Sequence, residues 1–138
     1  MADCVFCKII NKEIPANFVY NDEFVVAFLD INPLNRVHVL VVPKKHYENI
    51  FDIEAKILEK IIVIGQKLSQ KAKGVLGAEG VNLLNASGGA AEQTVPHFHL
   101  HIVPRWEEDG LRMNDWWQSK TKKLSAEELE EIAGKLKS

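Results

Sequence analysis

Apolar and polar positions alternate in short blocks over the first third of the chain. Residues 5–13 carry apolar side chains at helical spacing, which predicts a short amphipathic helix ended by Pro15. Residues 19–29 are rich in Val, Phe and Tyr, and a polar Asn-Asp-Glu break inside them predicts two strands. After a turn of Asp, Asn and Pro, the β-branched residues 37–42 predict a third strand.

A different periodicity starts at Asp52. Apolar residues then recur every three or four positions from Ile53 to Ala72, which predicts a helix of five turns or more with one face on the core. Gly74 and Gly77 follow, and we expect them to end this helix because glycine adopts the left-handed backbone of a helix C-terminus.

The remaining pattern predicts two more strands and a final helix. The strands are expected at 80–85 and 95–103, separated by a Gly/Ala-rich loop at 86–92. Ser125 and Glu128 have the spacing of a capping box, so a helix is expected to follow them. Because the strands mostly follow one another and the long helix lies between them, we expect an α+β fold with an antiparallel sheet of about five strands, rather than a parallel βαβ fold.

Composition limits the class of protein. A chain of 138 residues with 46% hydrophobic and 26% charged residues is expected to form a single soluble domain. Its net charge of −2 disfavours nucleic acid or an anionic membrane as a partner. Two cysteines are too few for a disulfide framework, and the first residues do not read as a signal sequence, so a cytoplasmic location is expected.

Three histidines at alternate positions, His97, His99 and His101, carry the strongest chemical signal. Alternate side chains of a strand share a face, so we expect the imidazoles on one side and the apolar residues between them in the core. Given one histidine, chance places two more at these positions with a probability on the order of 0.001. Imidazole is both a metal ligand and a nucleophile, so the spacing alone leaves open a three-histidine metal site and a phosphoryl- or nucleotidyl-transfer site.

The motif around these histidines resembles that of a known family. His-x-His-x-His with apolar x, preceded by Gln93-Thr94-Val95, is similar to the signature of the histidine triad family of nucleotide hydrolases and transferases. The similarity continues through three earlier segments, which are 4–15, 27–33 and 38–46. It implies one histidine triad domain over 1–138, with the functional core at 4–105 and a C-terminal tail at 106–138.

The resemblance implies catalysis through a covalent intermediate. His99 would be the nucleophile, attacking an α-phosphorus to give a nucleotidyl-imidazole that water then hydrolyses. His101 is the candidate proton donor, and His97 completes the catalytic set as the first triad histidine. His38 matches a fourth active-site histidine, expected to orient groups inside the site.

The implied substrate is a purine nucleoside 5′-phosphoramidate, because residues 4–46 resemble the phosphoramidate-cleaving branch most. A dinucleoside polyphosphate hydrolase is the first alternative, since residues 93–95 and 103–105 also fit that branch. A non-catalytic nucleotide-binding module is the second, although the presence of His99 disfavours it. No organic cofactor is implied.

The same resemblance matches side chains to the parts of a nucleotide. Those matched to the phosphate are Asn85, Gln93, Thr94, His99 and His101. The carboxylate matched to the ribose hydroxyls is Asp30. The apolar slot for the base is matched by Phe6, Ile9, Phe28, Leu29 and Ile31. Strand-end capping, turn formation and core packing are the structural alternatives for these residue types.

Cys4 and Cys7 have the spacing of a metal-binding pair, which by itself is half of a zinc site. The resemblance to bacterial-type relatives implies that His46 and His97 complete a structural Cys₂His₂ zinc site. Such a zinc would hold the N-terminal helix against the triad strand. The alternative is two buried thiols and a surface His46. A redox pair is disfavoured because no βαβ unit surrounds the cysteines.

Some positions depart from the family pattern. Glu92 stands where relatives commonly carry glycine, and a carboxylate there would repel a phosphate unless it points to solvent. Val37 replaces another common glycine. In the tail, Trp116 and Trp117 are expected to pack in the core or in a dimer. The resemblance also implies a homodimer whose sheets join edge to edge.

Overall fold

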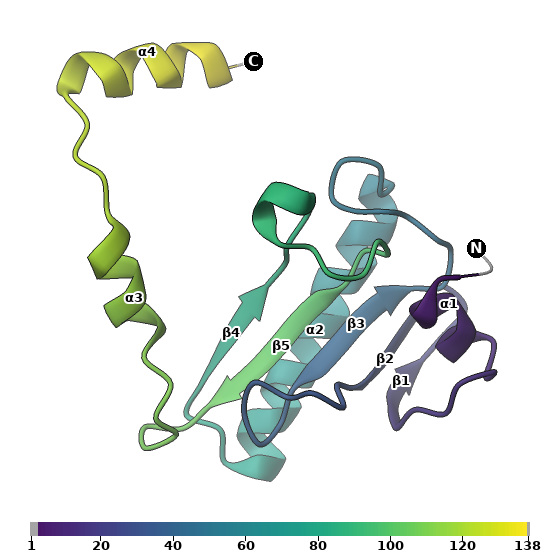
Figure 1. The fold of residues 1–138 in the computed structure, drawn as a ribbon. Helices are drawn as coiled ribbons and strands as arrows, with labels where there is room; N and C mark the ends of the chain where they lie inside the picture. The colour runs from purple at the N-terminus through teal and green to yellow at the C-terminus, as the bar shows by residue number, and fades with distance from the viewer. Residues whose placement is uncertain (1–2, 138) are drawn as a thin grey trace.

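A five-stranded antiparallel sheet in the order β1-β2-β3-β5-β4 forms the centre of the computed structural model (Figure 1). The strands are β1 Phe18–Asn21, β2 Val25–Leu29, β3 Val39–Pro43, β4 Gly80–Leu84 and β5 Leu100–Arg105. The helical elements are α1 Val5–Ile10, α2 Ala55–Leu76, the 3-10 turn η1 Gly89–Ala91, α3 Met113–Lys120 and α4 Ala126–Leu136. The structure describes residues 3–137, so residues 1, 2 and 138 of the predicted domain lie outside it. The expected α+β fold is confirmed.

The two faces of the sheet carry different cores, because successive residues of a strand point to opposite sides. The face covered by α2 buries Val25, Ala27, Val39, Val41, Tyr47, Ile57, Ile61, Ile64, Phe98, Leu100 and Ile102. The face that carries α1 buries Cys4, Phe6, Ile9, Val26, Phe28, Leu40 and Val42. With 6 residues against 22, α1 covers less of the sheet than α2 does. The α1 face therefore has room for a site.

Two glycines of the predicted long helix behave differently. Gly77 adopts a left-handed φ of 69° and caps α2, as expected, whereas Gly74 lies inside the helix and does not end it. Gly65 marks the point where α2 approaches β5, because a Cβ there would lie 3.2 Å from Cδ2 of Leu100. The helix is therefore longer than predicted and lies close against the strand that carries the triad.

The segment before β5 is not strand, although we expected strand over 95–103. The N–H of His97 donates to the carbonyl of Val95 at 2.8 Å, and the N–H of Phe98 donates to the carbonyl of Tyr47 at 2.7 Å. These bonds engage N–H groups that a sheet ladder would use, so regular pairing starts only where β5 begins. The prediction of one continuous strand was wrong for this reason.

The side chains of this segment still alternate as predicted. The rings of His97 and His99 contact Phe6 of α1, with centroids 5.8 Å and 5.1 Å apart. The ring of His101 lies 4.8 Å from that of His99. The apolar residues between and after them belong to the α2-side core. The three imidazoles therefore share the α1 face of the sheet.

Two other boundaries differ from the prediction. The first helix ends at Ile10 rather than at residue 13, because Lys12 adopts a left-handed φ of 61° that an α-helix cannot contain. The third strand begins at Val39 rather than at residue 37, because its partner on β2 ends at Leu29. Neither change moves a predicted site residue to another face.

Residues 106–137, which we call the arm, leave the body of the chain (residues 3–105) and lie beyond the β4 edge (Figure 1). Trp116 and Trp117 are 65% and 66% exposed. The interpretation that they pack in the core of the chain was therefore wrong, since α3 projects away from the body (Figure 1). The predicted capping box of Ser125 and Glu128 is confirmed at the start of α4.

Among the described residues, no helix combines the length and the apolar character that crossing a bilayer requires.

Candidate functional site

A cavity of about 350 Å³ opens on the α1 face of the sheet. The predicted site residues that line it are Phe6, Ile9, Phe28, Leu29, Asp30, Ile31, Thr94, His99 and His101. They come from α1, from β2 and the turn after it, from the segment that leads into β5, and from β5 itself. The structure thus brings the predicted ribose and base residues next to two of the triad histidines.

The cavity also has walls that the sequence reasoning did not assign to a site. These residues are Val5, Ile14, Pro15, Ala16, Asn32, Leu40 and Val95. Ile14 and Pro15 belong to the motif segment 4–15, which is a signal that could have found them. Four residues predicted for catalysis or phosphate binding are not among the lining, namely His38, Asn85, Gln93 and His97. Each of these four is bonded to other parts of the site instead.

His99 has one ring nitrogen bound and the other free. Its Nδ1 lies 2.8 Å from the carbonyl oxygen of His97. A carbonyl can only accept a hydrogen bond, so Nδ1 carries the proton and Nε2 of the neutral ring keeps its lone pair. Burial lowers the pKa of His99 below its usual value, which favours the neutral ring at pH 7. His99 therefore offers a nucleophilic nitrogen to the cavity that it lines.

A chain of hydrogen bonds fixes the protonation of His38 and His101. The backbone N–H of Leu34 donates to Nδ1 of His38 at 2.9 Å, so the proton of the neutral His38 ring is on Nε2. This Nε2 donates to Nδ1 of His101 at 2.8 Å. Burial lowers the pKa of His101 to about 4 and also lowers the pKa of His38, so both rings are neutral at pH 7. The neutral His101 ring consequently carries its own proton on Nε2.

Asp30 stands between the turn after β2 and the histidines. Its Oδ1 accepts from the N–H of Asn32 at 2.8 Å, so the turn bond expected for this residue type is present. Its Oδ2 lies 3.7 Å from Nε2 of His38. The turn therefore holds the carboxylate at the cavity wall without using both of its oxygens.

Asn85 and Gln93, both predicted to bind phosphate, are engaged in bonds within the chain. Asn85 donates from Nδ2 to the carbonyl of His99 at 3.0 Å. Gln93 accepts from the N–H of Gly88 at 2.8 Å and donates to the carbonyls of Glu48 and Val95 at 2.7 Å and 3.0 Å. Both amides thus brace the segment around the triad, and direct contact with a phosphate stays a prediction.

Glu92 follows η1 with a left-handed φ of 64°, and its side chain is exposed. Glycine adopts this backbone without steric cost, which is the physical reason a glycine suits the position. Because the carboxylate points to solvent, the repulsion expected if it faced a phosphate does not arise. Thr94, two residues further on, is the residue of this loop that lines the cavity.

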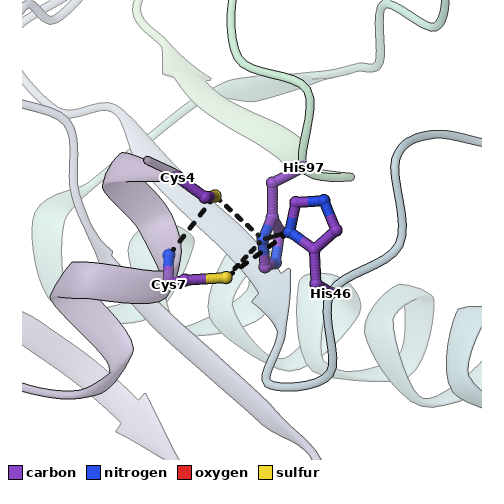
Figure 2. Close-up of side chains that lie close together, drawn as sticks. All are labelled: Cys4, Cys7, His46 and His97. Carbon is purple, nitrogen blue, oxygen red and sulfur yellow. Dashed lines mark hydrogen bonds between the residues drawn. The ribbon is translucent and has the colours of Figure 1, made fainter. Parts of the chain in front are cut away.

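A second cluster joins Cys4 and Cys7 to His46 and His97 (Figure 2). The Nδ1 atom of His97 lies 3.4 Å from Sγ of Cys4 and 3.6 Å from Sγ of Cys7. The Nδ1 atom of His46 lies 3.4 Å from Sγ of Cys7 and 3.0 Å from Nδ1 of His97. All four ligand atoms lie within 4.8 Å of one another, and their elements are the start of α1, the loop after β3 and the segment before β5.

The donor set and its spacing fit a tetrahedral zinc ion. Bonds of about 2.0–2.1 Å to nitrogen and about 2.3 Å to sulfur place tetrahedral ligand atoms about 3.3–3.8 Å apart, close to the distances observed. Nε2 of His97 donates to the carbonyl of Pro43 at 2.9 Å, which leaves the lone pair of Nδ1 for the cluster. Burial lowers the pKa of His97 to about 4, so its ring is neutral and able to bind a metal.

Comparison with known proteins finds relatives over most of the chain. A model of the HIT domain matches residues 11–108. An uncharacterised HIT-like protein of Methanocaldococcus jannaschii is 52% identical over 107 residues, which cover 78% of this chain and 82% of that protein. Adenylylsulfatase HINT3 of Arabidopsis thaliana is 35% identical over 134 residues, which cover 97% of this chain and 66% of that protein.

Two solved structures extend the likeness to three dimensions. SMU.412c of Streptococcus mutans superposes with a TM-score of 0.88 at 32% identity, covering 99% of this chain and 84% of that chain. A Zn-bound histidine triad family protein of Mycobacterium smegmatis superposes with a TM-score of 0.78 at 39% identity, covering 81% of each chain. The first superposition includes the arm, because residues 1–105 are only about three quarters of the 138 residues and cannot alone give 0.88.

Proposed function

This chain belongs to the HIT domain family, and from that premise we propose that it is a nucleotide hydrolase that cleaves purine nucleoside 5′-phosphoramidates. The observation that carries the proposal is a pair of neighbouring imidazoles in one cavity with opposite roles. His99 offers a lone pair on Nε2, and His101 carries a proton on Nε2. One ring can attack phosphorus while the other binds a phosphoryl oxygen or protonates the leaving group.

In the first step, Nε2 of His99 attacks the α-phosphorus, and the bond from phosphorus to the leaving nitrogen breaks. The His99 ring becomes a nucleotidyl-imidazolium, whose Nδ1–H is already held by the carbonyl of His97. The negative charge of the bound phosphate raises the pKa of His101 above its value in the free protein, so the ring takes up a second proton from water and becomes an imidazolium before this step. It gives the proton on Nε2 to the leaving nitrogen, which departs as a neutral amine, and the ring returns to its neutral form.

In the second step, water attacks the same phosphorus, and the bond to Nε2 of His99 breaks. One proton of the water passes to His101, which restores its starting state, and the product is a nucleoside 5′-monophosphate. Since Nδ1 of His101 faces His38, the proton exchange takes place at Nε2. His38 is thus a positioning residue for this step.

The nucleoside is held on the α1 side of the cavity in this proposal. The carboxylate of Asp30 accepts hydrogen bonds from the ribose hydroxyls, and the apolar slot takes the base. Phe6 and Phe28 pack edge to face in this slot, with ring centroids 5.6 Å apart. An apolar slot binds a large flat base by contact area, which favours a purine.

We also propose that Cys4, Cys7, His46 and His97 hold a structural zinc ion. The ion would cross-link α1 to the segment before β5 and take no part in the chemical steps. The Zn-bound relative from Mycobacterium smegmatis supports this assignment, as does the fit of the four donor atoms. Through His97, whose carbonyl holds Nδ1 of His99, the metal cluster would stabilise the nucleophile in its reactive tautomer.

A homodimer joined through β4 is the proposed assembly. β4 is the edge strand next to β5, and its side chains Val81 and Leu83 are exposed. Edge strands with free backbone groups and apolar side chains are templates for pairing with another strand. A two-fold axis between two β4 strands would continue the sheet from one copy into the other. The cytoplasmic location, and the expectation of neither a nucleic-acid nor a membrane partner, stay predictions from composition.

Turnover of three substrate classes tests the proposed activity. We expect kcat/KM to be highest for adenosine 5′-phosphoramidate, lower for a dinucleoside polyphosphate and lower for adenylyl sulfate. The last is included because a relative is named an adenylylsulfatase, and its sulfate leaving group needs no proton. A dinucleotide cleaved as fast as the phosphoramidate would favour the first alternative. Absence of any turnover, with nucleotide binding retained, would favour the non-catalytic module.

A trapping experiment tests the covalent intermediate. Rapid acid-free quenching during turnover, followed by mass spectrometry of peptides, should show one nucleotidyl group on the peptide that contains His99. Nucleotidylation of another histidine would contradict the assignment of the nucleophile.

A further inference from the structure

Beyond its root at residues 106–113, the arm does not pack against the described part of its own body. Within the described residues, neither α3 nor α4 has a buried side chain. On α4, Leu129, Ile132 and Leu136 recur at helical spacing and are 54%, 45% and 80% exposed, so an apolar stripe faces solvent. A helix of 11 residues is marginal in water by itself. Its stability therefore requires contact with another surface.

The root of the arm is held rigidly to the body. Arg105, the last residue of β5, donates to both carboxylate oxygens of Asp109 at 2.8 Å and 3.1 Å. It also donates to Oδ1 of Asn82 on β4 at 2.7 Å and to the carbonyl of Leu111 at 2.6 Å. Asp109 in turn accepts from the N–H groups of Trp106 and Leu111. The direction in which the arm leaves the body is therefore fixed by a closed set of hydrogen bonds.

That direction lies on the side of the β4 edge. Arg105 pairs with Gly80, the first residue of β4, and both α3 and α4 lie beyond this edge (Figure 1). A second copy paired through β4 would occupy the same side of the molecule. The arm would then lie against the second copy, while its own body remains out of reach.

Two further observations point to a protein surface as the occupant. In the Streptococcus mutans relative, the arm superposes on this one, and helices that bury no side chain against their own body keep one position when another molecule holds them. The polar positions of α4 are mostly acidic, which disfavours a nucleic acid or an anionic membrane as the partner of the helix. The acidic residues are Glu127, Glu128, Glu130 and Glu131.

We propose that the arm of each copy clasps the body of a second copy, with the apolar stripe of α4 packed against it. The inference rests on the proposed homodimer and extends it. In a two-fold dimer the contact occurs twice, so the arm of each copy packs on the body of the other copy. Trp116 and Trp117, exposed on α3, add large apolar surfaces to the same contact.

Cross-linking between isotopically distinct copies tests the clasp. A photo-reactive phenylalanine analogue replaces Ile132 in the full chain, and ¹⁵N-labelled and unlabelled copies are mixed in equal amounts before illumination. We expect about half of the cross-linked peptide pairs to join a labelled arm to an unlabelled body or the reverse. The same probe at Glu130, on the opposite face of α4, should cross-link weakly. Cross-links confined to peptides of one isotope would overturn the proposal.

The dissociation constant of the dimer, measured by sedimentation, is the second test. Leu129→Gln combined with Ile132→Gln should raise this constant by about 100-fold, because the stripe loses its apolar surface. The matched control, Glu127→Gln with Glu130→Gln, should change it by less than about threefold. An unchanged constant in the first double variant, or a monomeric full chain, would contradict the clasp.

Neither measurement depends on catalysis. The same results are expected in a His99→Asn background, which lacks the proposed nucleophile but keeps the arm intact. A chain that dimerises with clasped arms yet hydrolyses no nucleotide would refute the proposed function alone. A chain that hydrolyses phosphoramidates without arm cross-links between copies would refute the clasp alone.

Discussion

His97 and His99 are only two residues apart, yet they present opposite ring nitrogens. His97 donates from Nε2 to the carbonyl of Pro43 and turns Nδ1 toward the cysteines. His99 donates from Nδ1 to the carbonyl of His97, which leaves Nε2 for the cavity. Burial lowers the pKa of both rings. Residue type and burial are the same for the two histidines. The ring nitrogen that donates to a backbone carbonyl therefore determines whether the other nitrogen of each ring faces a metal site or a substrate.

The surroundings of the two free nitrogens differ as well. The free Nδ1 of His97 faces the thiols of Cys4 and Cys7 and the imidazole of His46, and these groups form a closed set of four ligands typical of a structural metal site. The free Nε2 of His99 faces a cavity, which is the open position that a reaction requires. Because the carbonyl of His97 is the acceptor for Nδ1 of His99, the closed and the open site share one residue. A change at one of these two sites should therefore be measurable at the other.

The largest effect is expected from His99→Asn. Asparagine can still donate to the carbonyl of His97 but has no nucleophilic nitrogen, so turnover should fall by at least about 1,000-fold. Binding of a nucleoside monophosphate, measured by calorimetry, should stay within about threefold, and the zinc content should be unchanged. Turnover within tenfold of the wild type would contradict the proposed nucleophile.

Cys7→Ser is expected to act on both sites. Loss of one ligand should remove the zinc, lower the midpoint of thermal unfolding and reduce kcat by about 10- to 100-fold, since His97 no longer holds His99 firmly. Metal analysis, calorimetry and steady-state kinetics measure the three changes. Lys8→Ser, one residue further along α1, is the matched control and should change none of them. A Cys7→Ser protein with full activity would separate the two sites.

A pH dependence of stability is expected from His101. Its pKa is about 4 in the folded chain and near 6.5 in the unfolded chain, so only the unfolded state binds a proton between these values. The free energy of unfolding should therefore fall as the pH is lowered from about 6.5 to about 4. His101→Gln should remove about 1–2 kcal/mol of this fall, a figure reduced for the partial exposure of the ring. Urea unfolding at pH 7 and pH 5 measures it, and equal slopes in both proteins would contradict the prediction.

The smallest effect is expected from Asn85→Ala. This change removes the bond from Nδ2 to the carbonyl of His99 and should cost about 1 kcal/mol of stability, with a two- to fivefold loss of kcat. Ser87→Ala is the control, because Ser87 donates to Oδ1 of Asn85 without touching His99. If both variants behave alike, the bond to the His99 carbonyl has no special role.

Local patterns predicted most of the fold. The presence of five strands along the chain, the long helix and the capping box of α4 all follow from periodicities and motifs within one element. The late start of β5 could not be predicted, because it depends on a backbone bond between Phe98 and Tyr47, which lie far apart in the sequence. The exposure of Trp116 likewise depends on where the arm goes, which local periodicity does not contain.

For the site, the motif predicted which residues lie together but not the protonation states of their rings. The free nitrogen of each histidine is chosen by a partner from elsewhere in the chain, such as Leu34 for His38 and Pro43 for His97. The bracing bonds of Gln93 to Glu48 are also long-range. Sequence patterns predict which side chains are present in the site. Hydrogen bonds to the folded backbone then determine which of their atoms remain free to bind a ligand.

The position of α1 has a consequence for the order in which the protein folds. Phe6 and Ile9 are a wall of the cavity, and Cys4 faces His97, which is 93 residues later in the chain. A contact that closes so long a loop is entropically costly and forms late. Phe6 can pack on Phe28 early, whereas the contact of Cys4 with His97 must wait for almost the whole body. A chain with a finished sheet but an undocked α1 lacks one wall of the cavity, so we expect the site to be completed late in folding.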